Sequence, residues 1–132
     1  MVAPRIYSLD TSVCVPVLRE QATFRELPSP DETVISSIVA AELWAGANKR
    51  GRRDPQFARV AEFLEIFTVV DFSEEAARHY GEIRAELEKK GMSIGPLDLL
   101  IAAHARSLGA TLMTANVGEF RRVKGLKLLA WK

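Results

Sequence analysis

Short apolar runs alternate along the chain with longer segments in which apolar residues recur every three or four positions. The short runs are typical of buried β-strands, and the longer segments are typical of amphipathic helices. The pattern predicts five strands, over residues 5–9, 33–36, 67–72, 110–114 and 126–131. It predicts helices between them, over residues 13–25, 38–49, 57–66, 74–91 and 96–108. Strands separated by helices indicate an α/β fold with a mostly parallel central sheet of about five strands.

Several residues mark where these helices begin and end. Ser36 or Ser37 can cap the second predicted helix and Ser73 the fourth, because a hydroxyl accepts hydrogen bonds from the free N–H groups of the first turn. Pro96 suits the first position of the fifth helix, and Gly109 suits the residue just beyond its end. In a parallel sheet, ligands bind beyond the carboxyl ends of the strands. The residues that follow each strand are therefore the first candidates for a functional site.

Size and composition indicate one domain over residues 1–132. Hydrophobic residues make up 48% of the chain, charged residues make up 27%, and the formal net charge is +1. This balance excludes a disordered tail, a collagen-like fibre and a polybasic nucleic-acid coat, although it leaves room for a local basic patch. No apolar run reaches the ~20 residues of a membrane helix, and the first residues lack the apolar stretch of a signal peptide. A single cysteine, Cys14, cannot form an internal disulfide, so we expect a cytoplasmic protein with no membrane partner.

Three acidic residues interrupt apolar segments and have no Lys or Arg within four positions. Asp10 ends the first predicted strand, Glu42 lies within IVAAELWAGA, and Asp98 lies within GPLDLLIAAHA. Most other acidic residues have a basic neighbour within one helical turn, as is usual on solvent-exposed helix faces. An acid in such an apolar segment is expected on a semi-buried surface, where its charge is costly unless something compensates it.

Two interpretations of these acids remain open on spacing alone. If they converge, each pair of carboxylates about 5 Å apart repels by about 3 kcal/mol at an effective dielectric constant near 20. Such a cluster must take up a proton or bind a cation, and oxygen ligands without Cys or paired His favour Mg²⁺ or Mn²⁺. Alternatively, the three acids are unrelated: one at a strand end, one on a helix face, and one near a helix N-terminus, where the helix dipole favours a negative charge.

Four motifs in order carry a resemblance to a known family. They are LDTSV with Asp10, AAELWAGA with Glu42, GPLDLLIAAHA with Asp98, and LMTANVGEF with Asn116 and Glu119. Together they resemble the PIN-domain ribonucleases, specifically the VapC-type toxins of bacterial toxin–antitoxin pairs. The resemblance runs from about residue 7 to residue 131, and it rests on the order and distances of the motifs, since each motif alone is common.

The resemblance implies a PIN-like α/β/α sandwich with an acidic metal site. In that site Asp10, Glu42 and Asp98 would form the acidic triad that holds Mg²⁺, with Mn²⁺ as a substitute. Asp10 and Asp98 would bind the metal directly, and Glu42 directly or through water. Asn116 occupies a fourth position where relatives carry Asp or Asn, and Glu119 could supply the missing charge there.

Hydroxyl and basic side chains near these motifs are further candidates. Thr114 belongs to the same short motif as Asn116, and Thr11 or Ser12 could orient Asp10 or touch a phosphate. A basic cluster follows the helix of Glu42, and it either guides an RNA backbone or forms a solvated loop. Its members are Lys49, Arg50, Arg52 and Arg53.

The activity that the resemblance implies is Mg²⁺-dependent endoribonuclease action, in which water attacks phosphorus in RNA such as tRNA or rRNA. The implied partners are a cognate VapB-type antitoxin that blocks the acidic site and a second copy of the chain, so that a homodimer enters a larger toxin–antitoxin complex. One alternative keeps the fold but makes it a catalytically inactive RNA- or protein-binding module, because Asn116 replaces an acid. A phosphoryl-transfer fold of the haloacid-dehalogenase type fits less well, because it requires an Asp where Ser12 stands.

Overall fold

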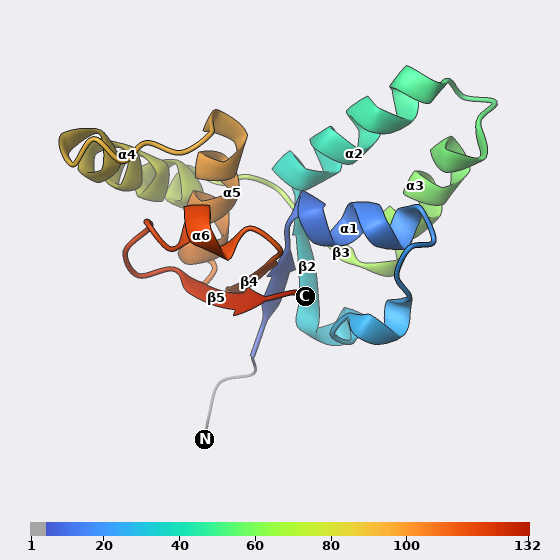
Figure 1. Ribbon diagram of the computed structural model, residues 1–132, viewed down its shortest axis with the longest axis horizontal. Coiled ribbons are helices and arrows are strands. Elements are labelled where there is room, and N and C mark those ends of the chain that lie inside the picture. Colours follow the sequence, from blue (N-terminus) through green and yellow to red (C-terminus); the bar gives the residue numbers. More distant parts are fainter. Residues whose placement is uncertain (1–4) are drawn as a thin grey trace.

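The computed structural model describes residues 5–132 and contains a five-stranded sheet with helices packed around it (Figure 1). The strands are all parallel, and their order across the sheet is β3-β2-β1-β4-β5. The prediction of an α/β fold with a parallel five-stranded sheet is therefore confirmed. The strand bounds are β1 Tyr7–Leu9, β2 Thr33–Ser36, β3 Thr68–Val70, β4 Thr111–Thr114 and β5 Lys127–Ala130.

The chain leaves β1 toward β2 on one side and later returns to β4 on the other side of β1. Strand order therefore reverses next to β1, which in an open α/β sheet is where ligands bind. The register pairs Leu9 with Met113, so the residues just after these two strands lie side by side at the carboxyl edge.

The helices form two groups that lie on either side of the view in Figure 1. One group contains α1, α2 and α3, and the other contains α4, α5 and the short α6. Their bounds are α1 Thr11–Leu18, α2 Ser37–Arg50, α3 Pro55–Ile66, α4 Glu74–Lys89, α5 Pro96–Ser107 and α6 Val117–Phe120. Two single turns of 3₁₀ helix precede β2, at Phe24–Glu26 and Pro30–Glu32.

The capping predictions are confirmed. The Ser36 hydroxyl accepts a hydrogen bond from the backbone of Ile38, and the Ser73 hydroxyl accepts one from Ala76. Each such cap stabilises its helix by about 1 kcal/mol. Gly109 follows the end of α5 with a φ of 65°, a left-handed conformation that glycine adopts without steric cost.

The helical spacing over residues 13–25, with a break expected early at Pro16, differs from the structure in both its bounds and its break. Helix α1 begins at Thr11, contains Pro16, and ends at Leu18. The carbonyl of Pro16 accepts from the backbone of both Gln21 and Ala22, and Glu20 has a φ of 60°, which turns the chain out of the helix. The spacing of apolar residues continues through this turn, so it did not indicate where the helix ends.

The core lies between the sheet and both helix groups. Fully buried side chains include Leu9, Ile35 and Leu112 from three adjacent strands, and they pack with Val13 and Phe63 from the helices. Cys14 is buried in the same core as a free thiol. Within residues 5–132, no helix combines the length and the apolar character that crossing a membrane requires.

Candidate active site

Asp10 stands at the carboxyl edge of the sheet, between the ends of β1 and β4. Its backbone N–H donates to the Met113 carbonyl at 3.2 Å, which extends the pairing of the two strands by one residue. Asp10 also occupies the N-cap position of α1, but its side chain makes no capping hydrogen bond. The carboxylate is therefore available for other contacts, although the residue is only 4% exposed.

Two hydroxyl groups hold the Asp10 carboxylate. Ser12 Oγ donates to Oδ1 at 2.5 Å, and Thr114 Oγ1 donates to Oδ2 at 2.6 Å. The same hydroxyl oxygens accept from the backbone of the next loop, Ser12 from Ala115 at 3.0 Å and Thr114 from Asn116 at 2.9 Å. The two hydroxyls thus fix the start of α1, the end of β4 and the carboxylate in one arrangement.

Burial raises the pKa of Asp10 above its ordinary value, because removal from water disfavours the charged form. The hydrogen bonds from Ser12 and Thr114 act in the opposite direction and stabilise the carboxylate. A buried carboxylate with two donors but no cationic partner is a costly arrangement for a purely structural residue.

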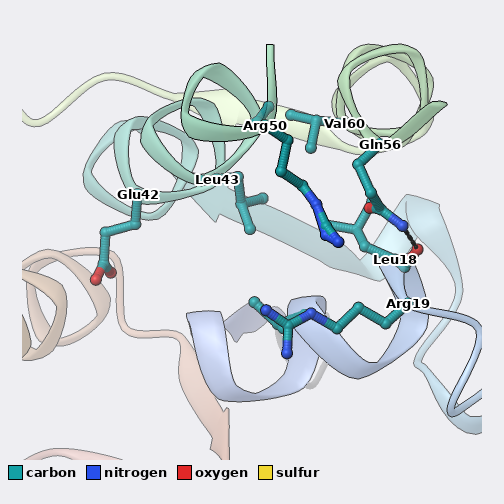
Figure 2. A pocket seen from close by; sticks show the side chains of 10 residues that line it. Leu18, Arg19, Glu42, Leu43, Arg50, Gln56 and Val60 are labelled. Carbon is teal, nitrogen blue, oxygen red and sulfur yellow. Dashed lines mark hydrogen bonds between the residues drawn. The ribbon is translucent and has the colours of Figure 1, made fainter. Parts of the chain in front are cut away.

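Glu42 projects from α2 toward the start of α1 (Figure 2). Thr11 Oγ1 donates to Glu42 Oε1 at 2.6 Å, so the first residue of α1 positions this second acid. Of the two hydroxyls predicted to orient Asp10, the structure places Ser12 on Asp10 and Thr11 on Glu42.

Asp98 lies in the first turn of α5, and Glu119 from α6 lies beside it. Gly95, just before α5, joins the two acids: its backbone N–H donates to Glu119 Oε1 at 2.8 Å. A Cβ placed on Gly95 would lie 3.6 Å from Asp98 Oδ2 and 3.7 Å from Glu119 Oε1. Both carboxylates therefore approach the same short piece of backbone.

The surroundings of Asp98 and Glu119 shift their pKa values in opposite directions. The pKa of Asp98 rises from 3.8 to about 6, first through burial and then through repulsion by Glu119, Asp10 and Glu42. The hydrogen bond from Gly95 lowers the pKa of Glu119. As the pH falls, Asp98 is therefore the first of the two acids to take up a proton, and Glu119 keeps its charge longer. The charges of Glu119, Asp10 and Glu42 thus all reach Asp98, which favours the converging interpretation of the acids over the unrelated one.

Asn116 reaches the site indirectly. Its side chain is exposed and donates through Nδ2 to Glu119 Oε2 at 2.7 Å. The Asn116 amide therefore orients Glu119. Glu119 in turn brings to the carboxyl edge of the sheet the negative charge that an uncharged amide cannot supply.

A buried hydrogen bond joins the helices that carry Glu42 and Asp98. Ser36 Oγ, the cap of α2, lies 2.7 Å from Nδ1 of His104 on α5. Ser36 Oγ also accepts from the backbone of Ile38, so one hydroxyl contacts both the first turn of α2 and the imidazole on α5. Burial lowers the pKa of His104, in keeping with a neutral ring. His104 is thus a structural link between α2 and α5.

The donor set at this edge suits a hard divalent cation. Asp10, Glu42, Asp98 and Glu119 offer carboxylate oxygens, and none of them forms an ion pair with a basic side chain among residues 5–132. In the same residues, no three acidic, His or Cys side chains already stand as a group able to hold an ion. A cation at this edge would therefore require the carboxylates to turn toward one another, and the raised pKa of Asp98 indicates that they repel without one.

The predicted basic cluster is exposed at and beyond the end of α2. Of its members only Arg50 lines a pocket that also contains Glu42. Arg52 lies over the ring of Phe57, 5.9 Å from its centre.

Three features that shape this region carry no signal in the sequence. Gly95 contributes a backbone group, and a glycine before a proline indicates only a turn. The contact between Ser36 and His104 joins residues 68 positions apart. Arg19, the residue after α1, lines the same pocket as Glu42 of α2, and no local pattern shows that these two residues share a pocket.

Known proteins are similar to this chain in both fold and sequence. The PIN domain family matches residues 7–126. Ribonuclease VapC2 of Rickettsia felis is 41% identical over 131 residues, which cover 96% of this chain and 98% of the relative. The tRNA(fMet)-specific endonuclease VapC of Shigella flexneri is 38% identical over 128 residues, which cover 95% and 97%. The crystal structure of DNA-bound VapBC from Salmonella typhimurium matches with a TM-score of 0.90 and 35% identity over 97% of this chain and 99% of that one.

The chain thus combines a parallel α/β sheet with acidic side chains near its switch point. With the matches above, the chain belongs to the PIN-domain family, in the group of VapC-type ribonucleases.

Proposed function

We propose that this protein is a Mg²⁺-dependent endoribonuclease toxin that hydrolyses tRNA and is inhibited by a cognate VapB-type antitoxin. The observation that carries the proposal is the convergence of Asp10, Glu42 and Asp98, with Glu119, at the carboxyl edge of the sheet without a cationic partner. The family assignment supports nuclease chemistry at that edge.

Asp10 and Asp98 are the proposed direct ligands of Mg²⁺, for which Mn²⁺ would substitute. Glu42 would bind directly or through water, and Glu119 would take the place of the acid that Asn116 lacks. A bound divalent cation supplies positive charge to a phosphate under attack and makes a nearby water molecule more acidic.

Hydrogen-bond donors around the acids prepare them for this role. Ser12 and Thr114 hold both oxygens of Asp10, which limits the rotation of its carboxylate. Thr11 holds only Oε1 of Glu42 and leaves Oε2 for an ion or a water molecule. In this way the hydroxyls reduce the conformational entropy that ligands lose when a cation binds.

The substrate and partners are proposed from the relatives. The VapC proteins of Shigella flexneri and Salmonella typhimurium are named as tRNA(fMet)-specific endonucleases, which supports tRNA over rRNA as the substrate class. Several similar structures are of VapBC, which supports a VapB-type antitoxin as the partner. We further propose that the chain enters the toxin–antitoxin complex as a homodimer. A cytoplasmic location fits a protein that acts on tRNA and carries one reduced, buried cysteine.

The test is cleavage of purified bacterial RNA by the wild-type protein and by Asp98→Ala, each with Mg²⁺ and with EDTA. We expect discrete fragments only from the wild type with Mg²⁺, and circular dichroism would verify that the variant is folded. Cleavage in EDTA, or Mg²⁺-dependent cleavage by the folded variant, would contradict the proposal.

A second candidate is an inactive PIN domain that binds RNA or protein. It is favoured by the amide at Asn116 and by the lack, among the described residues, of a preformed group of metal ligands. Binding of tRNA by the folded wild type without cleavage in Mg²⁺ or Mn²⁺ would support it.

A further inference from the structure

A groove between α1, α2 and α3 begins beside the acidic site and contains two arginines from different helices (Figure 2). Leu18, Leu43 and Val60 contribute apolar side chains to it. Arg19 comes from the end of α1 and Arg50 from the last turn of α2, and their guanidinium groups both extend into the space between these helices (Figure 2). We refer to this space as the arginine groove.

The geometry of α2 joins the groove to the site. Glu42, Gly46 and Arg50 are four positions apart, so they share one face of the helix. All three line the groove. No atom lies within 4 Å of the place where a Cβ of Gly46 would stand, so the groove is open between Glu42 and Arg50.

The opposite wall is held in place by a polar contact. Gln56 of α3 donates through Nε2 to the carbonyl of Leu18 at 2.9 Å, which fixes the end of α1 against α3. The next residue, Arg19, therefore projects from an anchored backbone, although its side chain is long and exposed.

The two arginines have little to neutralise them. Among residues 5–132, the side chain of Arg19 takes part in no ion pair or hydrogen bond with another side chain. Arg50 has one distant partner, Asp54, with 3.9 Å between Nε and Oδ1, and that same oxygen already accepts from the backbone of Gln56 at 2.8 Å. Two guanidinium groups that extend into one groove are complementary to an anion with several acceptor oxygens, because each can donate two parallel hydrogen bonds.

We propose that Arg19 and Arg50 bind a backbone phosphate of the RNA strand whose scissile phosphate lies at the acidic site. The inference rests on the proposed nuclease function and adds a substrate-binding site to it. An RNA strand is favoured over an acidic peptide because the groove continues along α2 to Glu42, where a neighbouring phosphate of the same strand would have to lie. The arginines act as positioning residues and do not touch the reacting atoms.

The test compares Arg19→Gln, Arg50→Gln and the double variant with a matched control, Arg78→Gln. Arg78 is exposed on α4, where it pairs with Glu74 at 3.1 Å, and it belongs to the other helix group, away from the groove. Its replacement removes one positive charge, as each single groove variant does. Binding of a labelled bacterial tRNA would be measured in EDTA over a range of salt concentrations. We expect each single groove variant to weaken binding about fivefold and to reduce the salt slope by about 1, and the double variant to have a larger effect on both.

Steady-state cleavage in Mg²⁺ distinguishes a positioning role from a general loss of structure. Arg19→Gln and Arg50→Gln should each raise KM with kcat nearly unchanged, since each removes a contact to RNA that is equally strong in the ground state and in the transition state. A further variant, Gly46→Glu, adds a carboxylate to the lining of the groove while it keeps both arginines, and it should weaken tRNA binding at least as much as either single change.

Each outcome separates this inference from the proposed function. If the wild type cleaves RNA and the groove variants match Arg78→Gln in affinity, salt slope and KM, the phosphate site is wrong and the nuclease stands. If they keep tRNA binding but lose binding to the antitoxin, the groove holds a peptide and the inference is also wrong. If the wild type neither binds nor cleaves tRNA, the proposed function fails and the inference fails with it.

Discussion

Replacing Asp98 with asparagine should make the metal-free protein more stable at neutral pH. In the folded state the pKa of Asp98 is about 6, compared with 3.8 for an unperturbed carboxyl. The stabilising contribution of neutral Asp98 is therefore fully present below pH 3.8 and is lost as the pH rises through about 6. At pH 7 the charged carboxylate opposes folding, and an uncharged amide at the same position removes that penalty.

The size of the effect follows from the same shift. A rise from 3.8 to about 6 corresponds at full strength to about 3 kcal/mol. Asp98 is partly exposed, so solvent screening reduces this value, and the dipole of α5 favours a charge in its first turn by about 0.5 kcal/mol. We therefore expect a net gain of about 1 kcal/mol, or about 4 °C in Tm for a domain of this size.

The assay is thermal unfolding of the wild type and Asp98→Asn in EDTA at pH 7 and pH 4. The variant should unfold about 4 °C higher at pH 7, and the difference should shrink toward zero at pH 4, where wild-type Asp98 is neutral as well. Glu119→Gln is the matched comparison, because it removes the neighbouring charge but keeps an oxygen that can accept from Gly95. In that variant, the pKa of Asp98 measured by carboxyl NMR should fall below about 6. A variant at Asp98 that is less stable than the wild type at pH 7, or equally stable at both pH values, would refute the repulsion on which the site depends.

Three further substitutions test the surroundings of the site. Thr114→Val removes a buried donor to Asp10 and should cost about 1–3 kcal/mol in urea unfolding, so an unchanged midpoint would argue against the hydroxyl support. Ser36→Ala removes both the cap of α2 and the partner of His104 Nδ1, and it should lower the free energy of unfolding by about 2–4 kcal/mol. A loss under about 1 kcal/mol would mean that this link is not formed in solution. Gly46→Ala should raise the free energy of unfolding by up to about 1 kcal/mol, because alanine favours the helix and nothing lies within 4 Å of the new Cβ, and a decrease would show that the groove is closed at this point.

The three acids proposed as metal ligands could be predicted because each one stands out against the residues next to it in the sequence. Asp10 ends an apolar strand, and Asp98 follows a proline at a helix start, so both positions are evident from neighbouring residues. Glu42 is recognisable because an acid in an Ala- and Leu-rich helix has no basic neighbour. Once the sheet is parallel, its carboxyl edge brings such residues together.

The remaining features depend on contacts between distant residues or on backbone geometry. Gly95 acts through its N–H group, which every residue except proline possesses, so no pattern identifies it. The end of α1 is set by a left-handed turn at Glu20, a residue type that seldom adopts that conformation. Periodicity describes which face of a helix is apolar, but it carries little information about where the helix stops.

Anomalous diffraction from crystals of the protein soaked in Mn²⁺ would show directly whether the acids bind a metal. We expect an anomalous peak at the carboxyl edge of the sheet, in contact with the carboxylates of Asp10 and Asp98, and its loss in Asp98→Asn crystals. A well-ordered site without a peak at Mn²⁺ concentrations that support RNA cleavage, or a peak held by other residues, would contradict the claim that these acids form the metal centre of a nuclease.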